Sequence, residues 1–144
     1  MRALVQRVAS ARVSVAKQTV AEIAAGLLVL VGVTHSDDSD CAQRLAAKVR
    51  ALRVFTDAAG RMNEPLAGRE VLAVSQFTLY ADTRHGTRPS FVDAAAPEQA
   101  RALYELFCEQ LGCARGQFGA NMQIELVADG PVTVMLETHA PAAG

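Results

Sequence analysis

The stretch "GLLVLVGV", residues 26–33, contains eight consecutive residues without a polar side chain. A short, continuous apolar run of this kind is typical of a strand that is buried on both faces. It is too short for an amphipathic helix and shows no helical period. The sequence therefore predicts a fully buried strand at 26–33, around which the remaining elements have to pack.

Patterns on either side of this run predict further strands and a first helix. Apolar and polar residues alternate in "RALVQRV" (2–8) and "ARVSVA" (11–16), and "KQTVAEI" (17–23) could form the return strand of a hairpin. A helix is predicted from Asp40, where apolar residues recur at spacings of four, four and three; they are Cys41, Leu45, Val49 and Leu52.

Further strands and a second helix are predicted in the second half of the chain. We expect a short strand at 53–55, a Gly-rich loop at 56–70, a strand at 71–80, a helix from Pro97, a Gly-rich connection at 112–121, two strands within 122–138 and a frayed tail at 139–144. This order predicts a single α+β domain over 1–144. Its sheet should be mixed or antiparallel and barrel-like, covered by the two helices.

Bulk properties exclude several classes of function. The net charge is −1, whereas a protein that binds long nucleic acids through their phosphates usually has a basic surplus. Any nucleic-acid contact should therefore be short and local, and no DNA partner is expected. The longest apolar run, "IAAGLLVLVGV", is too short to cross a bilayer, so no membrane partner is expected.

The cysteines and histidines give no sign of a metal or cofactor. Cys41, Cys108 and Cys113 are odd in number and form no CxxC motif, which suits a reducing, cytoplasmic location. The three histidines are scattered, so no metal site is predicted. Dinucleotide, P-loop and nucleophile-elbow motifs are missing from the sequence, so no cofactor is expected.

One strand carries polar groups where a core strand should be apolar. In "LAVSQFTLYAD" (72–82), Ser75, Gln76 and Thr78 interrupt the apolar pattern. Burying such groups without partners costs roughly 1–3 kcal/mol each. Alternation places Gln76 and Thr78 on one face and Ser75 and Phe77 on the other, so a regular strand cannot direct all four into one pocket. Either these are satisfied groups of a core strand, or the strand ends or bulges there and forms a site.

Two further places are candidates for function. Gly130-Pro131 marks a turn or a sheet edge, because proline cannot donate to a sheet ladder. The loop "TRHGTRPSF" (83–91) carries Arg84, His85 and Arg88 beside the polar strand. It could be an ordinary solvated loop, or it could hold a phosphate next to a site.

Together these places resemble the D-aminoacyl-tRNA deacylase family. The matching blocks are "VSQFTLYAD" (74–82), "GTRPSF" (86–91) and "FGANMQIELVADGPVT" (118–133), with looser matches in "RVFTDAAGRMN" (53–63) and "LVQRV" (4–8). They run in family order over nearly the whole chain. The segments 64–70 and 112–117 look shorter than in the family and put only the local loop shape in doubt.

The resemblance implies a homodimer with two active sites at the subunit interface. The catalytic segment would be Ser75, Gln76, Phe77 and Thr78. The substrate-binding residues would be Gly130, Pro131, Arg7, Met122, Pro89, Ser90 and Phe91. In the family the Gly–Pro peptide is cis and reaches into the partner's pocket, Arg7 helps to fix it, and Phe77 with the 86–91 loop seats the terminal adenosine.

The implied reaction is hydrolysis of the ester bond of D-aminoacyl-tRNA, which releases free D-amino acid and tRNA. Such an ester is already activated, so positioning and oxyanion stabilisation by backbone N–H groups near Phe77 and Thr78 could suffice. Thr78 as a covalent nucleophile is the rival mechanism and would need a base. If L-residues are rejected by steric exclusion, glycyl-tRNA should also be hydrolysed. Two other functions stay open: a relative that clears an L-amino acid, with a trans Gly–Pro peptide, and a non-catalytic module that binds tRNA or DNA ends.

Overall fold

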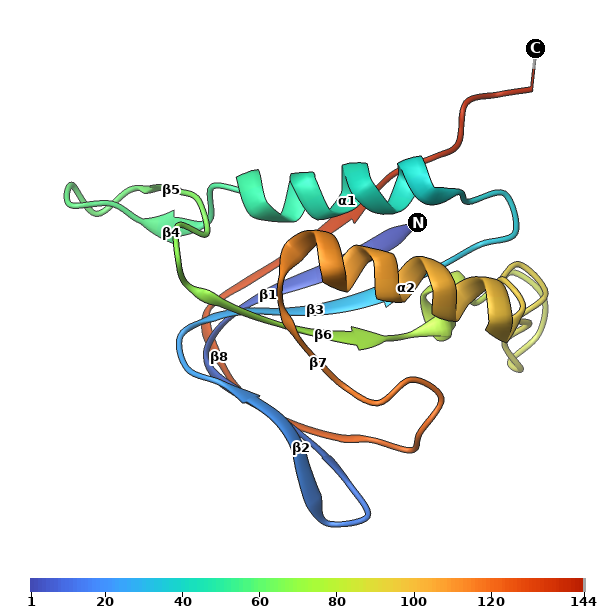
Figure 1. The fold of residues 1–144 in the computed structure, drawn as a ribbon, viewed down its shortest axis with the longest axis horizontal. Helices are drawn as coiled ribbons and strands as arrows, with labels where there is room; N and C mark the ends of the chain where they lie inside the picture. Colours follow the sequence, from blue (N-terminus) through green and yellow to red (C-terminus); the bar gives the residue numbers. More distant parts are fainter. Residues whose placement is uncertain (144) are drawn as a thin grey trace.

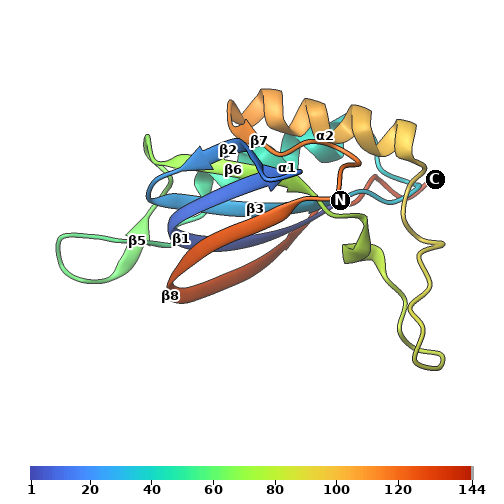
Figure 2. The ribbon, with the colours of Figure 1, turned by 90° about the horizontal axis from the view of Figure 1, so that it is seen from below.

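A computed structural model describes residues 1–143 of the chain (Figures 1 and 2). The helices are α1 (Ser39–Ala51) and α2 (Pro97–Leu111), with a short 3₁₀ helix η1 (Phe77–Tyr80). The strands are β1 (Arg2–Val15), β2 (Gln18–Ile23), β3 (Gly26–Gly32), β4 (Phe55–Thr56), β5 (Met62–Glu64), β6 (Glu70–Ser75), β7 (Ala114–Arg115) and β8 (Gln123–Glu137).

The main sheet is mixed and strongly curled. Its strands follow the order β2-β1-β3-β6-β7, and β8 pairs with the full length of β1 along the other edge. The pairs of β3 with β6 and of β6 with β7 are parallel, and the others are antiparallel. Figure 1 shows both helices on one side of the sheet, and Figure 2 shows β2 close to β6 and β7, so that the sheet curls toward closure. The predicted α+β class, with two helices over a barrel-like sheet, is confirmed.

The strand predicted at 26–33 is β3, which ends at Gly32 and is buried except for the half-buried Leu30. Leu27, Val29 and Val31 of β3 face the core under the helices, while Leu28 faces a second apolar cluster on the opposite side of the sheet. β6 divides its side chains in the same way. The two central strands therefore have apolar layers on both faces, which explains their lack of alternation.

Local signals define the ends of both helices, and α1 begins one residue before the predicted Asp40. Asp38 caps α1 by accepting a hydrogen bond from the Cys41 backbone N–H at 3.0 Å, and this bond lowers the pKa of the Asp38 carboxyl. Pro97 begins α2, and Gly112, in the left-handed conformation with φ 65°, ends it. The Tyr104 hydroxyl ties α2 to the sheet by donating to the Ala73 carbonyl at 2.8 Å.

Several boundaries differ from the prediction. The segments 2–8 and 11–16 form one strand, β1, and the segment 122–138 forms one strand, β8, because both halves of β8 pair with β1. The predicted loop at 56–70 contains β5, which pairs with β4, and the predicted connection at 112–121 contains β7. The tail at 139–143 has no regular secondary structure, although Arg44 donates to the His139 carbonyl at 2.6 Å; Gly144 lies outside the described residues.

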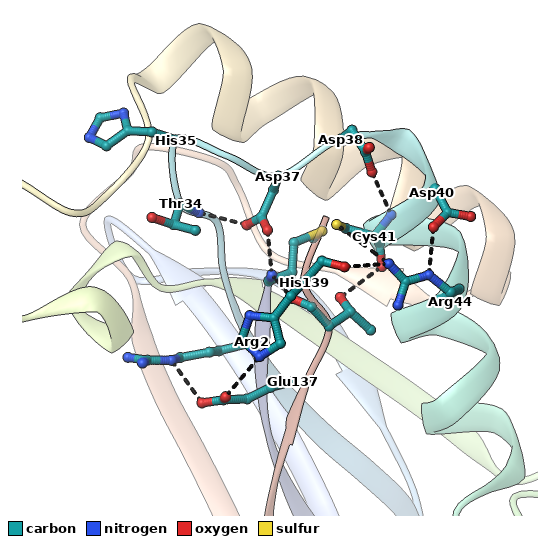
Figure 3. A network of polar contacts seen from close by, with 12 residues as sticks. Arg2, Thr34, His35, Asp37, Asp38, Asp40, Cys41, Arg44, Glu137 and His139 are labelled. Carbon is teal, nitrogen blue, oxygen red and sulfur yellow. Dashed lines mark hydrogen bonds and ion pairs between the residues drawn. The ribbon is translucent and has the colours of Figure 1, made fainter. Parts of the chain in front are cut away.

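A buried ion pair joins the first residue to the loop before α1 (Figure 3). The α-ammonium of Met1 donates to Asp37 Oδ1 at 2.7 Å and to the Thr138 carbonyl at 2.6 Å. The other carboxylate oxygen of Asp37 accepts from the Thr34 backbone N–H at 2.7 Å. The Asp37 side chain is 1% exposed, so its charge is compensated almost entirely by this one ammonium group.

We expect Asp37→Asn to destabilise the protein more than Asp38→Asn does. The first change leaves a buried ammonium without its counter-charge and should cost about 3 kcal/mol or more. The second replaces an exposed helix cap by a residue that caps about equally well, so it should change the stability far less. Urea unfolding at neutral pH measures both. Equal losses for the two variants would contradict the importance of the buried pair.

Candidate active site

The candidate site begins where β6 stops pairing with β3. The parallel register runs to Val31↔Ser75, and the Gln76 backbone N–H then donates to the Val31 carbonyl at 2.8 Å. After this bond the chain turns into η1, where the Leu79 N–H donates to the Gln76 carbonyl at 3.2 Å. The strand predicted at 71–80 thus ends at Ser75. Of the two arrangements that would allow a site, the structure has the one in which the strand ends.

This turn leaves two backbone donors free. Among the residues that the structure describes, the N–H groups of Phe77 and Thr78 have no hydrogen-bond acceptor. They are the first donors of a short helix, which have no partner within the helix itself. Both residues are exposed, with the Phe77 side chain among the more exposed large apolar groups at 54%. The turn can therefore donate hydrogen bonds to an external acceptor.

A cavity of about 650 Å³ lies beside the turn. Its floor comes from β3 and β6, and its walls come from the segment before α2 and the segment before β8. Its lining is mostly apolar and consists of Val31, Val33, Val74, Ser75, Gln76, Phe77, Phe91, Ala94, Ala95, Ala96, Pro97, Ala100, Phe118, Gly119, Ala120, Met122 and Ile124. The size is that of a typical small-ligand site.

Five of the predicted site residues line this cavity: Ser75, Gln76, Phe77, Phe91 and Met122. Phe77 and Phe91 meet edge to face, with ring centroids 5.1 Å apart. Thr78 does not line the cavity, and its hydroxyl accepts a hydrogen bond from the Gln76 side-chain amide. Two aromatic rings thus stand beside the free backbone donors.

The loop at 83–91 returns to the site through a short bridge. Asp82 and Ser90 exchange two backbone hydrogen bonds, at 2.8 and 2.9 Å, which place Phe91 against Phe77. Pro89 and Ser90 lie in this return but do not line the cavity. The Arg84 guanidinium binds Asp82 at 2.7 Å and lowers the pKa of that carboxyl to about 2. One of the loop's cations is therefore neutralised by Asp82, the residue that precedes the loop.

The Gly130-Pro131 segment lies elsewhere in the chain. β8 pairs Thr133 with Gln6 and Ala128 with Val8, so the four residues 129–132 oppose the single residue Arg7 and bulge out of the ladder. The Gly130-Pro131 peptide is cis, and both residues are exposed. Figure 1 shows this part of β8 far from the C-terminal end of β6.

Arg7 anchors the bulge. Its Nε donates to the Asp129 carbonyl at 3.1 Å, and its Nη1 donates to the Val54 carbonyl at 2.7 Å. The Asp129 carboxylate lies 3.4 Å from Nε. Arg7 is opposite Leu27 in the sheet, whereas Ser75 is opposite Val31, four residues further along β3. Arg7, Gly130 and Pro131 are thus brought together with one another and not with the cavity of their own chain.

Sequence reasoning missed part of the cavity wall. Ala94, Ala95 and Ala96 form it before α2, and small apolar residues in an irregular segment carry no periodic signal. Phe118 was available from the motif "FGAN" but was not assigned a role. Among residues 1–143 no group of three or more His, Cys, Asp or Glu side chains is arranged to hold a metal ion. No helix in the described part is long and apolar enough to cross a membrane.

Comparisons with known proteins identify the family of the chain. The family model described as D-Tyr-tRNA(Tyr) deacylase matches residues 4–137. D-aminoacyl-tRNA deacylases from Chloroherpeton thalassium and Idiomarina loihiensis are each 51% identical to the chain, covering 96% and 93% of it and 96% and 97% of the relatives.

Two solved structures share the fold. One, titled "c-Myc DNA Unwinding Element Binding Protein", superposes with a TM-score of 0.91 at 37% identity, covering 97% of this chain and all of that one. The other, titled as a probable eukaryotic D-amino acid tRNA deacylase, has a TM-score of 0.83 at 16% identity, over 95% and 98% of the two chains, and supports the fold alone. By its family model and its relatives, the chain belongs to the D-Tyr-tRNA(Tyr) deacylase family, whose members are hydrolases of the aminoacyl-tRNA ester bond.

Proposed function

We propose that this protein hydrolyses the ester bond of D-aminoacyl-tRNA and of glycyl-tRNA, and releases the free amino acid and the tRNA. One observation carries the proposal beyond family membership. The backbone N–H groups of Phe77 and Thr78 are free at the edge of a cavity of about 650 Å³. A substrate of this kind would be met in the cytoplasm, where charged tRNA serves translation.

Catalysis would rest on the two backbone donors. Attack on the ester carbonyl places negative charge on its oxygen, and fixed N–H groups aimed at that charge lower the barrier. The amides of Phe77 and Thr78 would supply this stabilisation without any side chain. Water would be the attacking group, oriented by the ribose 2′-OH of the substrate or by a polar side chain such as Gln76.

Covalent catalysis by Thr78 has less support. A hydroxyl nucleophile needs a base that removes its proton. The partner of the Thr78 hydroxyl is the Gln76 amide, which donates a hydrogen bond and cannot act as a base. In the described residues no carboxylate or imidazole hydrogen-bonds to this hydroxyl.

The aromatic pair would seat the terminal adenosine. Phe77 and Phe91 are exposed beside the free donors, and exposed aromatic rings stack favourably on nucleobases. The cavity is mostly apolar, which suits a base better than a phosphate. The rest of the tRNA would need few contacts, in keeping with the net charge of −1.

The Gly130-Pro131 bulge would complete the site of a second subunit. It is exposed, held by Arg7 and remote from the cavity of its own chain. β8 also exposes Leu126 at 37%, Val127 at 58% and Met135 at 44%, which is apolar area for a homodimer interface. Carbonyl groups of the bulge would accept from the substrate's α-ammonium and crowd out an L side chain.

Removal of one backbone donor should lower the rate of hydrolysis far more than removal of the side chain at the same position. Residue 77 is the first residue of a 3₁₀ helix, where proline is tolerated, and Gln76 before it, with φ −142° and ψ 84°, lies outside the α region that a following proline disfavours. We expect Phe77→Pro to lower kcat on D-tyrosyl-tRNA by about 10²–10³-fold relative to Phe77→Ala, which keeps the N–H. Thr78→Ala should retain most of the activity. A larger loss in Thr78→Ala than in Phe77→Pro would favour the hydroxyl mechanism.

Complementation between inactive chains tests the shared site. Gly130→Ala is strained, because φ is +129° and the new Cβ would lie 2.9 Å from the Val132 nitrogen. Phe77→Pro and Gly130→Ala should each be inactive alone. A purified heterodimer of the two, carrying different C-terminal tags, contains one intact cross-subunit site and should show about half of the wild-type activity. An inactive heterodimer would contradict the exchange of the Gly–Pro bulge.

Steric exclusion makes a prediction about the amino acid. Glycine has no Cβ, so a site that blocks the L direction should admit it. We expect the protein to hydrolyse D-tyrosyl-tRNA and glycyl-tRNA and to leave L-tyrosyl-tRNA intact, as measured by release of labelled amino acid. Survival of glycyl-tRNA under conditions that clear D-tyrosyl-tRNA would refute exclusion alone.

A second candidate function is binding of nucleic-acid ends without turnover. The name of the 37% identical structural relative, which refers to a DNA unwinding element, favours it. It predicts affinity for uncharged tRNA or single-stranded DNA and no release of any amino acid in the same assay.

A further inference from the structure

The end of α2 brings two cysteines into contact. Gly112 donates to the Glu109 carbonyl at 3.2 Å, and the Cys113 N–H donates back to the Cys108 carbonyl at 3.3 Å. These two bonds form a Schellman motif, which places Cys113, the second residue after the helix, beside Cys108, the fourth residue from its end. Cys113 Sγ accordingly donates to the Cys108 carbonyl oxygen at 3.9 Å, and the two thiols are close enough that each shifts the pKa of the other.

The two thiols differ in access and acidity. Cys108 is fully buried, whereas Cys113 is half-buried and lines a cleft of about 270 Å³ together with Arg69 and Glu70. The Cys108 thiol and the positive charge of Arg115 lower the pKa of Cys113, although burial opposes them. The neighbouring Cys113 thiol, together with burial, raises the pKa of Cys108. An acidic, accessible thiol beside a protected one is the arrangement of a redox-sensitive pair.

We propose that Cys113 and Cys108 form a peroxide-reactive pair in which Cys113 is oxidised first and Cys108 closes an intramolecular disulfide. The Cys113 thiolate attacks a hydroperoxide oxygen; an S–O bond forms, the O–O bond breaks, and the alkoxide that leaves takes up a proton. The Cys108 sulfur then attacks the Cys113 sulfur; an S–S bond forms, the S–O bond breaks, and water leaves with the Cys108 proton. Two thiols and one hydroperoxide thus give one disulfide, one alcohol and one water.

The disulfide would tie the end of α2 to β7. The segment after β7 contains Phe118 and Met122, which line the cavity. The cysteine pair therefore lies directly before this part of the cavity wall in the sequence. The proposal stands on the helix terminus and its cleft, and it does not depend on the proposed hydrolytic function.

Tryptic peptide mapping after peroxide treatment tests the pair directly. Cleavage after Arg101 and Arg115 yields one fragment, 102–115, that contains both cysteines, while Cys41 lies in the fragment 18–44. Cys41 is fully buried and burial raises the pKa of its thiol, so it is an internal reference. We expect the full-length protein, treated with hydrogen peroxide and digested without reduction, to lose two hydrogens from fragment 102–115 at least about tenfold faster than Cys41 reacts.

Two variants fix the order of events. In Cys108→Ala, Cys113 should gain oxygen instead of forming a disulfide, and in Cys113→Ala, Cys108 should remain a thiol. The proposal is overturned if the wild-type fragment keeps both thiols after Cys41 has reacted. It is equally overturned if the fragment gains only oxygen, or if it becomes cross-linked to another fragment.

Discussion

The parallel pairing of β3 with β6 is the constraint on which the rest of the structure depends. These two strands have apolar layers on both faces. Their ladder therefore supplies the hydrogen bonds of polar backbone groups that lie in the middle of the protein. Their ladder ends at Val31 and Ser75, and one more bond, from Gln76 to Val31, closes it. The chain turns at Phe77 because the ladder has ended, and this turn sets the position of the free donors and of the cavity beside them.

Helix α2 holds β6, and with it the turn at Phe77, in place. The Tyr104 hydroxyl bonds the Ala73 carbonyl in the middle of β6, and Gly116 donates to the same carbonyl at 2.9 Å. The start of α2, at Pro97, lies in the cavity wall, and its end carries the two cysteines. A single helix thus connects the candidate site to the thiol pair.

The fold was predictable where the signal is local. The strand at 26–33 follows from its continuous apolar run, and the two helices follow from apolar periodicity and from Pro97. The end of β6 at Ser75 was not predictable from periodicity, because Phe77, Leu79 and Tyr80 are good strand formers. The continuity of β8 was hidden for another reason: both of its halves pair with β1, a partner more than a hundred residues away, and no local pattern records such pairing.

The site was predictable only in part, and mainly through the family resemblance. Ser75, Gln76, Phe77, Phe91 and Met122 line one cavity, whereas Arg7, Gly130 and Pro131 form a separate bulge. Whether these two halves meet across subunits is a property of an assembly, which the order of residues in one chain does not determine. The alanines at 94–96 were not predicted to line the cavity, because their small side chains contribute by leaving room for it and carry no polar group that marks a site.

The free amides at the end of β6 have a consequence for how such a site can change in evolution. A donor that belongs to the main chain is encoded by every amino acid except proline, so most substitutions at positions 77 and 78 alter what surrounds the reacting bond without deleting the donor. The surroundings can then drift toward new substrates while the donors persist. Sensitivity shifts instead to residues whose packing fixes the end of the β3–β6 ladder, such as the buried Val31.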